Sequence, residues 1–145
     1  MAFQFTLQKI LEFKEKIKQE AEGKFAEASK AFEEEATKLY HLLKKKETYE
    51  ATCAEQLQTK ASILYIQQTQ ILLMRLQQDI HIQQQKTHVA RDKMRVKQDE
   101  LLTLSMELKK YEKLKEVQLL AYMEWMKREE SKQMDEIAVQ NYMNR

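Results

Sequence analysis

Apolar residues recur along the first part of the chain at the spacing of one face of an α-helix. The stripe consists of Phe3, Leu7, Ile10, Ile17, Ala21, Phe25, Ala28, Phe32, Ala36, Leu39 and Leu43. Its mean step of about 3.6 residues is closer to a straight amphipathic helix than to a strict heptad seam. Lys14 is the one charged residue within the stripe, and its aliphatic stem can lie along apolar surface while the ammonium group stays in water.

The second half of the chain carries a cleaner seven-residue repeat. One set of positions is Ile66, Leu73, Ile80, Thr87, Met94, Leu101 and Leu108, and Leu76, Ala90, Leu104 and Tyr111 lie between them, with Gln83 and Lys97 as polar breaks. An apolar pattern sustained over about six heptads predicts a coiled coil. Because the two regions have different periods, we expect a shallow and irregular supercoil.

The apolar stripe fades between these regions, where Lys44-Lys45-Lys46-Glu47 is highly charged. Thr59 and Ser62 are candidate N-caps for a second helix, although neither is followed three residues later by the Glu or Gln of a capping box. We therefore predict a hinge at about residues 57–63. The alternative is one continuous helix that dimerises, about 215 Å long at 1.5 Å per residue.

The predicted fold class is all-α: a long antiparallel two-helix coiled-coil hairpin with a projecting C-terminal helix. A single domain of residues 1–145 then comprises a first arm of about residues 3–57 and a second arm of about residues 63–118. Antiparallel pairing about residue 60 sets residue i opposite roughly residue 121 − i, which places Phe3 near Gln118. Residues 119–145 are therefore expected to extend beyond the first arm as an overhang.

The predicted overhang and the residues just before it are among the most apolar parts of the chain. Val117, Leu119, Leu120, Ala121, Tyr122, Met123, Trp125 and Met126 fall there, and Trp125 is the only tryptophan. An isolated helix in water gains nothing by exposing such a surface. The segment either folds back on the chain or meets another molecule, and we favour a partner.

Composition narrows the class of protein. One glycine, Gly23, and no proline leave the chain few means of turning, which is typical of long helices. A net charge of +2 from 25 basic and 23 acidic residues gives no bulk attraction to nucleic acid or anionic lipid. The N-terminus lacks the pattern of a signal peptide, no apolar run is long enough for a transmembrane segment, and Cys53 is the only cysteine, so we expect a cytoplasmic protein.

Residues for catalysis or metal binding are sparse. His81 and His88 are seven residues apart, whereas a helical metal pair needs a spacing of three or four, and His41 is distant in sequence. A chain with one glycine cannot form a phosphate-binding glycine loop. Acidic neighbours dilute the basic residues at 44–46 and 91–97. We therefore expect no enzyme activity, no cofactor, no metal site and no nucleic-acid partner.

Two short motifs resemble those of a known family. The opening Phe3-Gln4-Phe5-Thr6-Leu7-Gln8-Lys9-Ile10-Leu11-Glu12 resembles the start of FliJ proteins, which are small coiled-coil components of the bacterial flagellar type III export apparatus. The ending Lys132-Gln133-Met134-Asp135-Glu136-Ile137-Ala138 is similar to their C-terminal signature. The resemblance implies an antiparallel two-helix coiled coil, similar to the central stalk of rotary ATPases, with no enzyme activity of its own.

The resemblance also implies partners: the hexameric export ATPase FliI, with the end of the hairpin that carries the termini directed at the pore of its ring; the export gate protein FlhA; and export chaperones whose cycling it assists. Together with the apolar overhang, it assigns ATPase binding to Tyr122, Trp125, Met126, Met134, Asp135, Glu136 and Ile137. It assigns gate binding to Leu42, Tyr49, Leu72 and Leu76, with Lys45 where another aromatic residue would be expected.

The implied location is the cytoplasmic side of the flagellar base, peripheral to the inner face of the cell membrane. Two alternatives remain from the sequence. One is a structural coiled-coil dimer without an export role, and the other is the stalk of a related virulence-type secretion system.

Overall fold

The computed structural model describes residues 3–144, which form two α-helices and no strand. Helix α1 spans Gln8–Gln58 and helix α2 spans Ile63–Met143. The two helices pack against each other, so the predicted all-α hairpin is confirmed. The chain divides into two compact units, one of Met1–Glu20 with Leu102–Arg145 (unit 1) and one of Ala21–Leu101 (unit 2).

Residues 59–62 connect the helices in unit 2, inside the interval of about 57–63 that the sequence indicates. Lys60 has a φ of 56°, and the N–H of Ala61 donates to the carbonyl of Gln56 at 3.1 Å. This is the pattern of a Schellman C-cap, in which a left-handed residue turns the chain out of the helix. Glycine is the residue usually found at this left-handed position, but here it is a lysine. The one glycine of the chain, Gly23, lies instead at an exposed position within α1.

Ser62 begins α2 as predicted. The N–H of Tyr65 donates to the Ser62 hydroxyl at 3.4 Å, which satisfies one of the donors left free at a helix N-terminus. Thr59, the other candidate N-cap, belongs instead to the end of α1, where its hydroxyl donates to the carbonyl of Glu55 at 3.0 Å.

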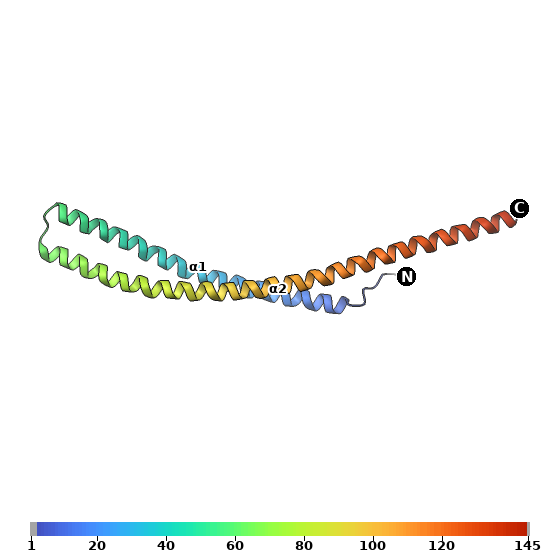
Figure 1. The fold of residues 1–145 in the computed structure, drawn as a ribbon, viewed down its shortest axis with the longest axis horizontal. Helices are drawn as coiled ribbons and strands as arrows, with labels where there is room; N and C mark the ends of the chain where they lie inside the picture. Colours follow the sequence, from blue (N-terminus) through green and yellow to red (C-terminus); the bar gives the residue numbers. More distant parts are fainter. Residues whose placement is uncertain (1–2, 145) are drawn as a thin grey trace. The chain divides into compact units, whose positions relative to one another are not determined.

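The two helices of unit 2 run antiparallel and side by side, as Figure 1 shows. Their covered positions follow interleaved heptads. In α1 these include Ala21, Phe25, Ala28, Phe32, Glu35, Leu39, Leu42, Lys46, Tyr49, Cys53 and Gln56, and in α2 they include Ile66, Thr69, Leu73, Leu76, Ile80, Gln83, Thr87, Ala90, Met94, Lys97 and Leu101. The predicted a/d pattern of the second helix is therefore confirmed as the seam of a coiled coil.

Two polar layers interrupt this seam. The side-chain amide of Gln83, which is 8% exposed, donates to the backbone carbonyl of Glu35 at 3.1 Å and to its carboxylate, and the Thr87 hydroxyl lies 3.2 Å from the same carbonyl. Nearer the turn, the Thr69 hydroxyl donates to the Gln56 side chain at 3.0 Å. A buried polar group that finds its partner in only one register fixes the alignment of the two helices at some cost in stability.

Unit 1 contains a small apolar core. Phe5, Leu11 and Leu108 are 3–6% exposed, and Phe3, Leu7 and Tyr111 pack against them. The Lys14 ammonium lies 3.0 Å from the Glu107 carboxylate, and this hydrogen bond and the opposite charge raise the pKa of Lys14. The residue numbers of this ion pair add to 121, the pairing that a single turn near residue 60 requires.

The first helix differs from its predicted pattern in two respects. It begins at Gln8, so Phe3 and Leu7 of the predicted stripe precede it, and its covered face is shifted. A 3.6-residue stripe includes Ile10 and Leu43, which are 41% and 39% exposed, and omits Leu11 and Leu42, which face the seam. The reason is the supercoil: packing along a partner helix tightens the effective repeat to 3.5 residues. Lys18, Glu35 and Lys46 also occupy heptad positions, where the aliphatic stems of their side chains cover the seam. A search for apolar residues alone does not find these positions.

Because Leu108 lies in the core of unit 1, we expect the stability of the protein to depend strongly on it. Replacing Leu108, which is 4% exposed, by alanine should lower the free energy of unfolding by roughly 2–4 kcal/mol, because it removes buried methyl groups and leaves a cavity. Leu102→Ala is the matched control, since Leu102 is 59% exposed and should change stability by less than about 0.5 kcal/mol. Equal losses in chemical denaturation of the two variants would contradict the assigned core.

The turn predicts a stabilising substitution. Lys60→Gly should raise the free energy of unfolding by about 0.5–1 kcal/mol, because glycine adopts the left-handed conformation without the penalty that a Cβ atom incurs. Lys45→Gly, on an exposed position within α1, should instead lower it by about 1 kcal/mol. Thermal melts of both variants decide between this turn and an α1 that continues through residue 60.

Candidate partner-binding surfaces

The segment Val117–Met126 of α2, in unit 1, is apolar on every side of the helix. Only Gln118 and Glu124 within it are polar. Val117, Leu120, Met123 and Trp125 are each 50–55% exposed, and successive residues point about 100° apart around the axis. A helix that is apolar all round is normally enclosed by other structure. We refer to Val117–Met126 as the apolar segment.

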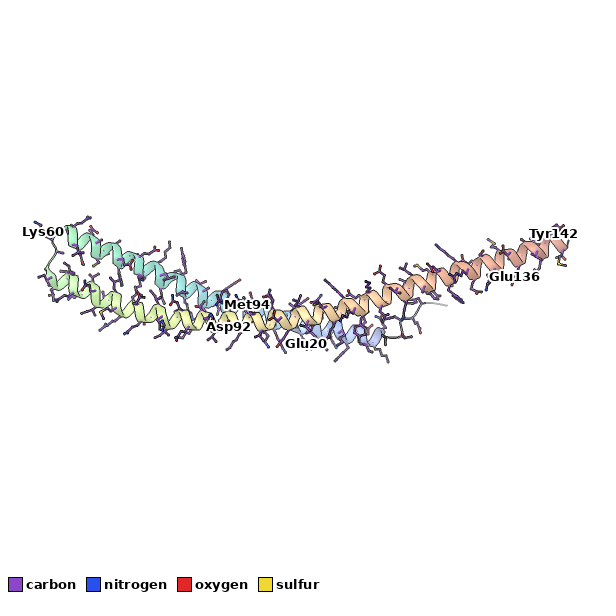
Figure 2. All side chains as sticks on the ribbon, in the orientation of Figure 1. Glu20, Lys60, Asp92, Met94, Glu136 and Tyr142 are labelled. Atoms are coloured by element: carbon purple, nitrogen blue, oxygen red, sulfur yellow. The ribbon has the colours of Figure 1, made fainter. Side chains whose placement is uncertain are left out.

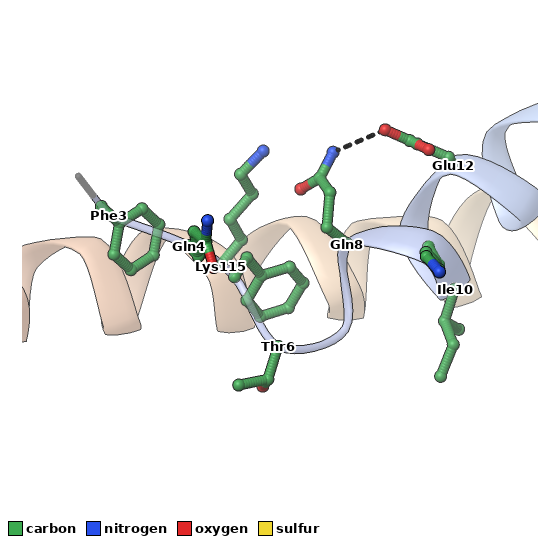
Figure 3. Close-up of a pocket in the computed structure, with 9 residues that line it drawn as sticks. Phe3, Gln4, Thr6, Gln8, Ile10, Glu12 and Lys115 are labelled. Atoms are coloured by element: carbon green, nitrogen blue, oxygen red, sulfur yellow. Dashed lines mark hydrogen bonds between the residues drawn. The ribbon is translucent and has the colours of Figure 1, made fainter. Parts of the chain in front are cut away.

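The N-terminal residues cover one side of the apolar segment. The Phe3 and Tyr122 ring centroids lie 5.5 Å apart, and those of Tyr122 and Trp125 lie 6.1 Å apart. Figure 3 shows Phe3 and Gln4 beside α2, close to Lys115. Simple helical pairing places Phe3 near Gln118, but the residues before Gln8 are not helical and rise more per residue than a helix, so they reach farther along α2.

The side chains on the remaining faces of the apolar segment are more exposed. Leu119, Tyr122 and Met126 are half-buried, whereas Trp125 is 51% exposed. Of the three predicted ATPase-binding residues in this segment, the structure therefore brings Tyr122 and Trp125 into one aromatic cluster with Phe3 and leaves Met126 on the partly covered side.

The C-terminal part of α2 is exposed from residue 130 to residue 144. Met134 is 70% exposed, Ile137 is 53% exposed, and Asp135 and Glu136 are also exposed. Figure 2 shows Glu136 and Tyr142 on this part of the helix. The predicted C-terminal signature thus presents two apolar side chains and two carboxylates on a single helix.

The four residues predicted to bind the gate lie in different environments in unit 2. Leu72 is 45% exposed, whereas Leu76 is 4% exposed and packs in the seam. Leu42 and Tyr49 are half-buried heptad positions of α1. At position 45, where another aromatic residue would be expected, Lys45 lies over the Tyr49 ring. Its ammonium group is 5.9 Å from the ring centroid, at the edge of cation–π distance.

The turn end of unit 2 presents an apolar surface that the sequence reasoning missed. Leu57, Ile63, Leu64 and Tyr65 are 64–74% exposed, and we call these four residues the tip surface. Lys60, labelled at the turn in Figure 2, is the only charged residue from Gln56 to Met74, in a chain that is 33% charged. That gap in the charges is the signal that would have identified the surface.

The histidine, cysteine and acidic side chains that could bind a metal do not lie together among the described residues. Within residues 3–144, no three His, Cys, Asp or Glu side chains are placed to hold a metal ion. His88 contacts Arg91 at 2.8 Å and Asp92 at 3.3 Å on the same helix, where His88 and Asp92 are exposed and Arg91 is half-buried. Cys53 is a half-buried free thiol. Neither helix, over the residues described, contains a stretch apolar enough to cross a membrane.

Two comparisons with known proteins identify the family of this chain. A family model described as flagellar FliJ protein matches residues 3–145. The flagellar FliJ protein of Bacillus subtilis (strain 168) is 32% identical over 143 residues, covering 99% of this chain and 97% of the relative. No solved structure matches significantly. A match over nearly the whole chain, on a helical hairpin with the expected motifs at both ends, shows that the chain belongs to the FliJ family of flagellar export components.

Proposed function

We propose that this protein is a non-enzymatic stalk of the flagellar export apparatus that couples the export ATPase ring to the export gate. In this proposal unit 1 binds the ATPase FliI and unit 2 binds the gate protein FlhA. The protein acts in the cytoplasm at the flagellar base and assists the cycling of export chaperones. The single observation that carries the proposal is the apolar segment Val117–Met126, which is apolar on all sides yet covered on only one.

An all-round apolar helix favours a partner that surrounds it. A partner that offers one groove would cover about half of the circumference and leave Met123 or Trp125 in water, because these two half-exposed side chains point to nearly opposite sides of the helix. The pore of a ring-shaped ATPase encloses a helix on every side, which matches this distribution. Met123 and Met126 suit such a site because their flexible, polarizable side chains adapt to varied surroundings.

Trp125 is the expected anchor of the ATPase contact. Its large ring is half exposed and is held by Tyr122, whose own ring is supported by Phe3. Aromatic side chains that are preorganised before binding lose little conformational freedom and dominate interface energetics. In this arrangement Met134, Asp135, Glu136 and Ile137 extend the contact along the exposed end of α2, where the two carboxylates favour basic side chains on the ATPase.

Gate binding is proposed for the face of unit 2 that carries Leu72. Its side chain is the one outward apolar group of the four candidates. Leu42 and Tyr49 contribute from the edge of the seam, and Leu76 supports the surface from beneath by packing between the helices. The proposal therefore separates direct contact by Leu72 from a positioning role for Leu76.

Loss of the aromatic anchor should weaken ATPase binding. We expect Tyr122→Ala combined with Trp125→Ala to raise the Kd for the FliI hexamer at least about tenfold, because buried aromatic anchors each contribute about 2 kcal/mol or more. The measurement is biolayer interferometry, with circular dichroism to show that helicity is unchanged. Leu102→Ala, also an exposed apolar residue of α2 in unit 1, should leave the Kd unaltered. Unchanged affinity in the double variant would refute the proposed ATPase site.

The gate contact has its own matched pair of variants. Leu72→Ser should weaken binding to the cytoplasmic part of FlhA about fivefold or more, since it removes an apolar contact group. Met74→Ser alters a more exposed residue roughly 200° around the same helix and should have no effect. Equal effects of the two substitutions in a pull-down titration would argue against a gate site centred on Leu72.

A further inference from the structure

Unit 2 contains a groove between α1 and α2 that the proposed function does not use. Ala28 and Ala31 form its α1 side, and Ile82, Val89 and Val96 line it from α2. Two adjoining hollows share Ala28, Val89 and Lys93, so the groove is continuous over that stretch. All of these residues lie within Ala21–Leu101, the bounds of unit 2.

The α2 side of the groove is a second heptad stripe. Ile82, Val89 and Val96 are seven residues apart and 52–54% exposed, whereas the seam with α1 uses other positions of the same helix. On a water-exposed helical face, β-branched residues have lower helix propensity than Glu, Lys or Gln and expose apolar surface. A two-helix hairpin needs one seam on each helix. The second stripe is therefore the pattern of a contact with a third helix.

The opposite wall leaves space for that helix. Ala28 and Ala31 have short side chains, so a neighbouring helix can seat large side chains between them and the Ile82–Val96 stripe. A helix with acidic side chains can lie in this groove, whereas two copies of the groove facing each other across a two-fold axis would bring its lining lysines together.

The charged residues along the groove indicate which charge a bound third helix should carry. Lys24, Lys86 and Lys93 line it and form no ion pair with another described residue. The acids nearby are already engaged: Asp92 contacts His88 at 3.3 Å, and the Glu35 carboxylate accepts from Gln83 and lies 3.8 Å from Lys38. Of the lining acids, only Glu27 has no such contact within the described part of the chain. Four lysines and three carboxylates line the two hollows, so the net charge of the groove is positive.

We propose that this groove binds a third helix from a different protein, an amphipathic helix with apolar residues at heptad spacing and carboxylates beside them. The apolar residues pack on Ile82, Val89 and Val96, and the carboxylates face Lys86 and Lys93. Binding of this kind converts part of the two-helix hairpin into a three-helix bundle. It is independent of the ATPase and gate contacts, since it uses neither the apolar segment nor Leu72.

The test uses three fluorescein-labelled peptides of about four heptads and the full-length chain. The acidic probe has Leu at the two core positions of each heptad and Glu beside them, the basic probe has Lys in place of those Glu residues, and the third is a scrambled acidic sequence without heptads. Anisotropy titrations should give the acidic probe a Kd at least about tenfold lower than those of the basic and scrambled probes, because charge complementarity and apolar periodicity act together.

Variants of groove residues test whether the acidic probe binds at the groove. Val89→Asn should weaken the acidic probe at least about fivefold, while Val139→Asn, at a similarly exposed valine of unit 1, should leave it unchanged. Lys86→Glu combined with Lys93→Glu should invert the preference in favour of the basic probe. These positions are exposed, so circular dichroism should show folded protein in every case.

Three results would overturn the proposal. The first is equal affinity for all three peptides, or no binding of any of them. The second is binding of the acidic probe that is insensitive to both Val89→Asn and the charge reversal. The third is a concentration-dependent dimer in sedimentation that Val89→Asn dissociates, which would give the groove to a second copy of this chain.

Discussion

The structure depends on a single antiparallel seam, in which heptad positions of one helix meet heptad positions of the other. The ion pair of Lys14 with Glu107 in unit 1 and the hydrogen bonds of Gln83 to Glu35 in unit 2 fit the same pairing about one turn. A seam of this kind has no alternative alignment that keeps both its apolar and its polar positions matched. The polar layers therefore cost stability but define the register, as single polar core positions do in other coiled coils.

A two-helix seam covers one side of each helix and no more. No described side chain is less than 2% exposed, and the buried apolar residues are few. Apolar residues that do not face the seam therefore remain at the surface, and four of the places where they lie are the apolar segment, the tip surface, the face of Leu72, and the groove of Ile82, Val89 and Val96. The placement of these surfaces can distinguish one partner from another.

The fold was largely predictable because its determinants are periodic and local. The heptads of the second helix and the turn near residue 60 follow from residue types and spacing, whereas the choice of Ser62 over Thr59 as N-cap needed the structure. The seam of the first helix was less predictable, since Lys18, Glu35 and Lys46 occupy core positions with only their stems. The contact of Phe3 with Tyr122 needed the extended conformation of the N-terminal residues, which no periodicity encodes. Leu72 and Leu76 were both predicted to bind the gate. That Leu72 faces outward and Leu76 packs in the seam becomes clear only once the position of the seam is known.

The most direct test of the antiparallel seam is a distance between spin labels at positions 13 and 106 of the isolated protein. Phe13 and Met106 are exposed residues of unit 1 that flank the ion pair of Lys14 with Glu107. Pulsed electron paramagnetic resonance should give a separation within about 25 Å, two helix diameters, and dilution with unlabelled protein should not change it. A separation near 140 Å, the helical rise between these positions in a continuous helix, would contradict the hairpin. So would a short distance that disappears on dilution, because it would arise between chains.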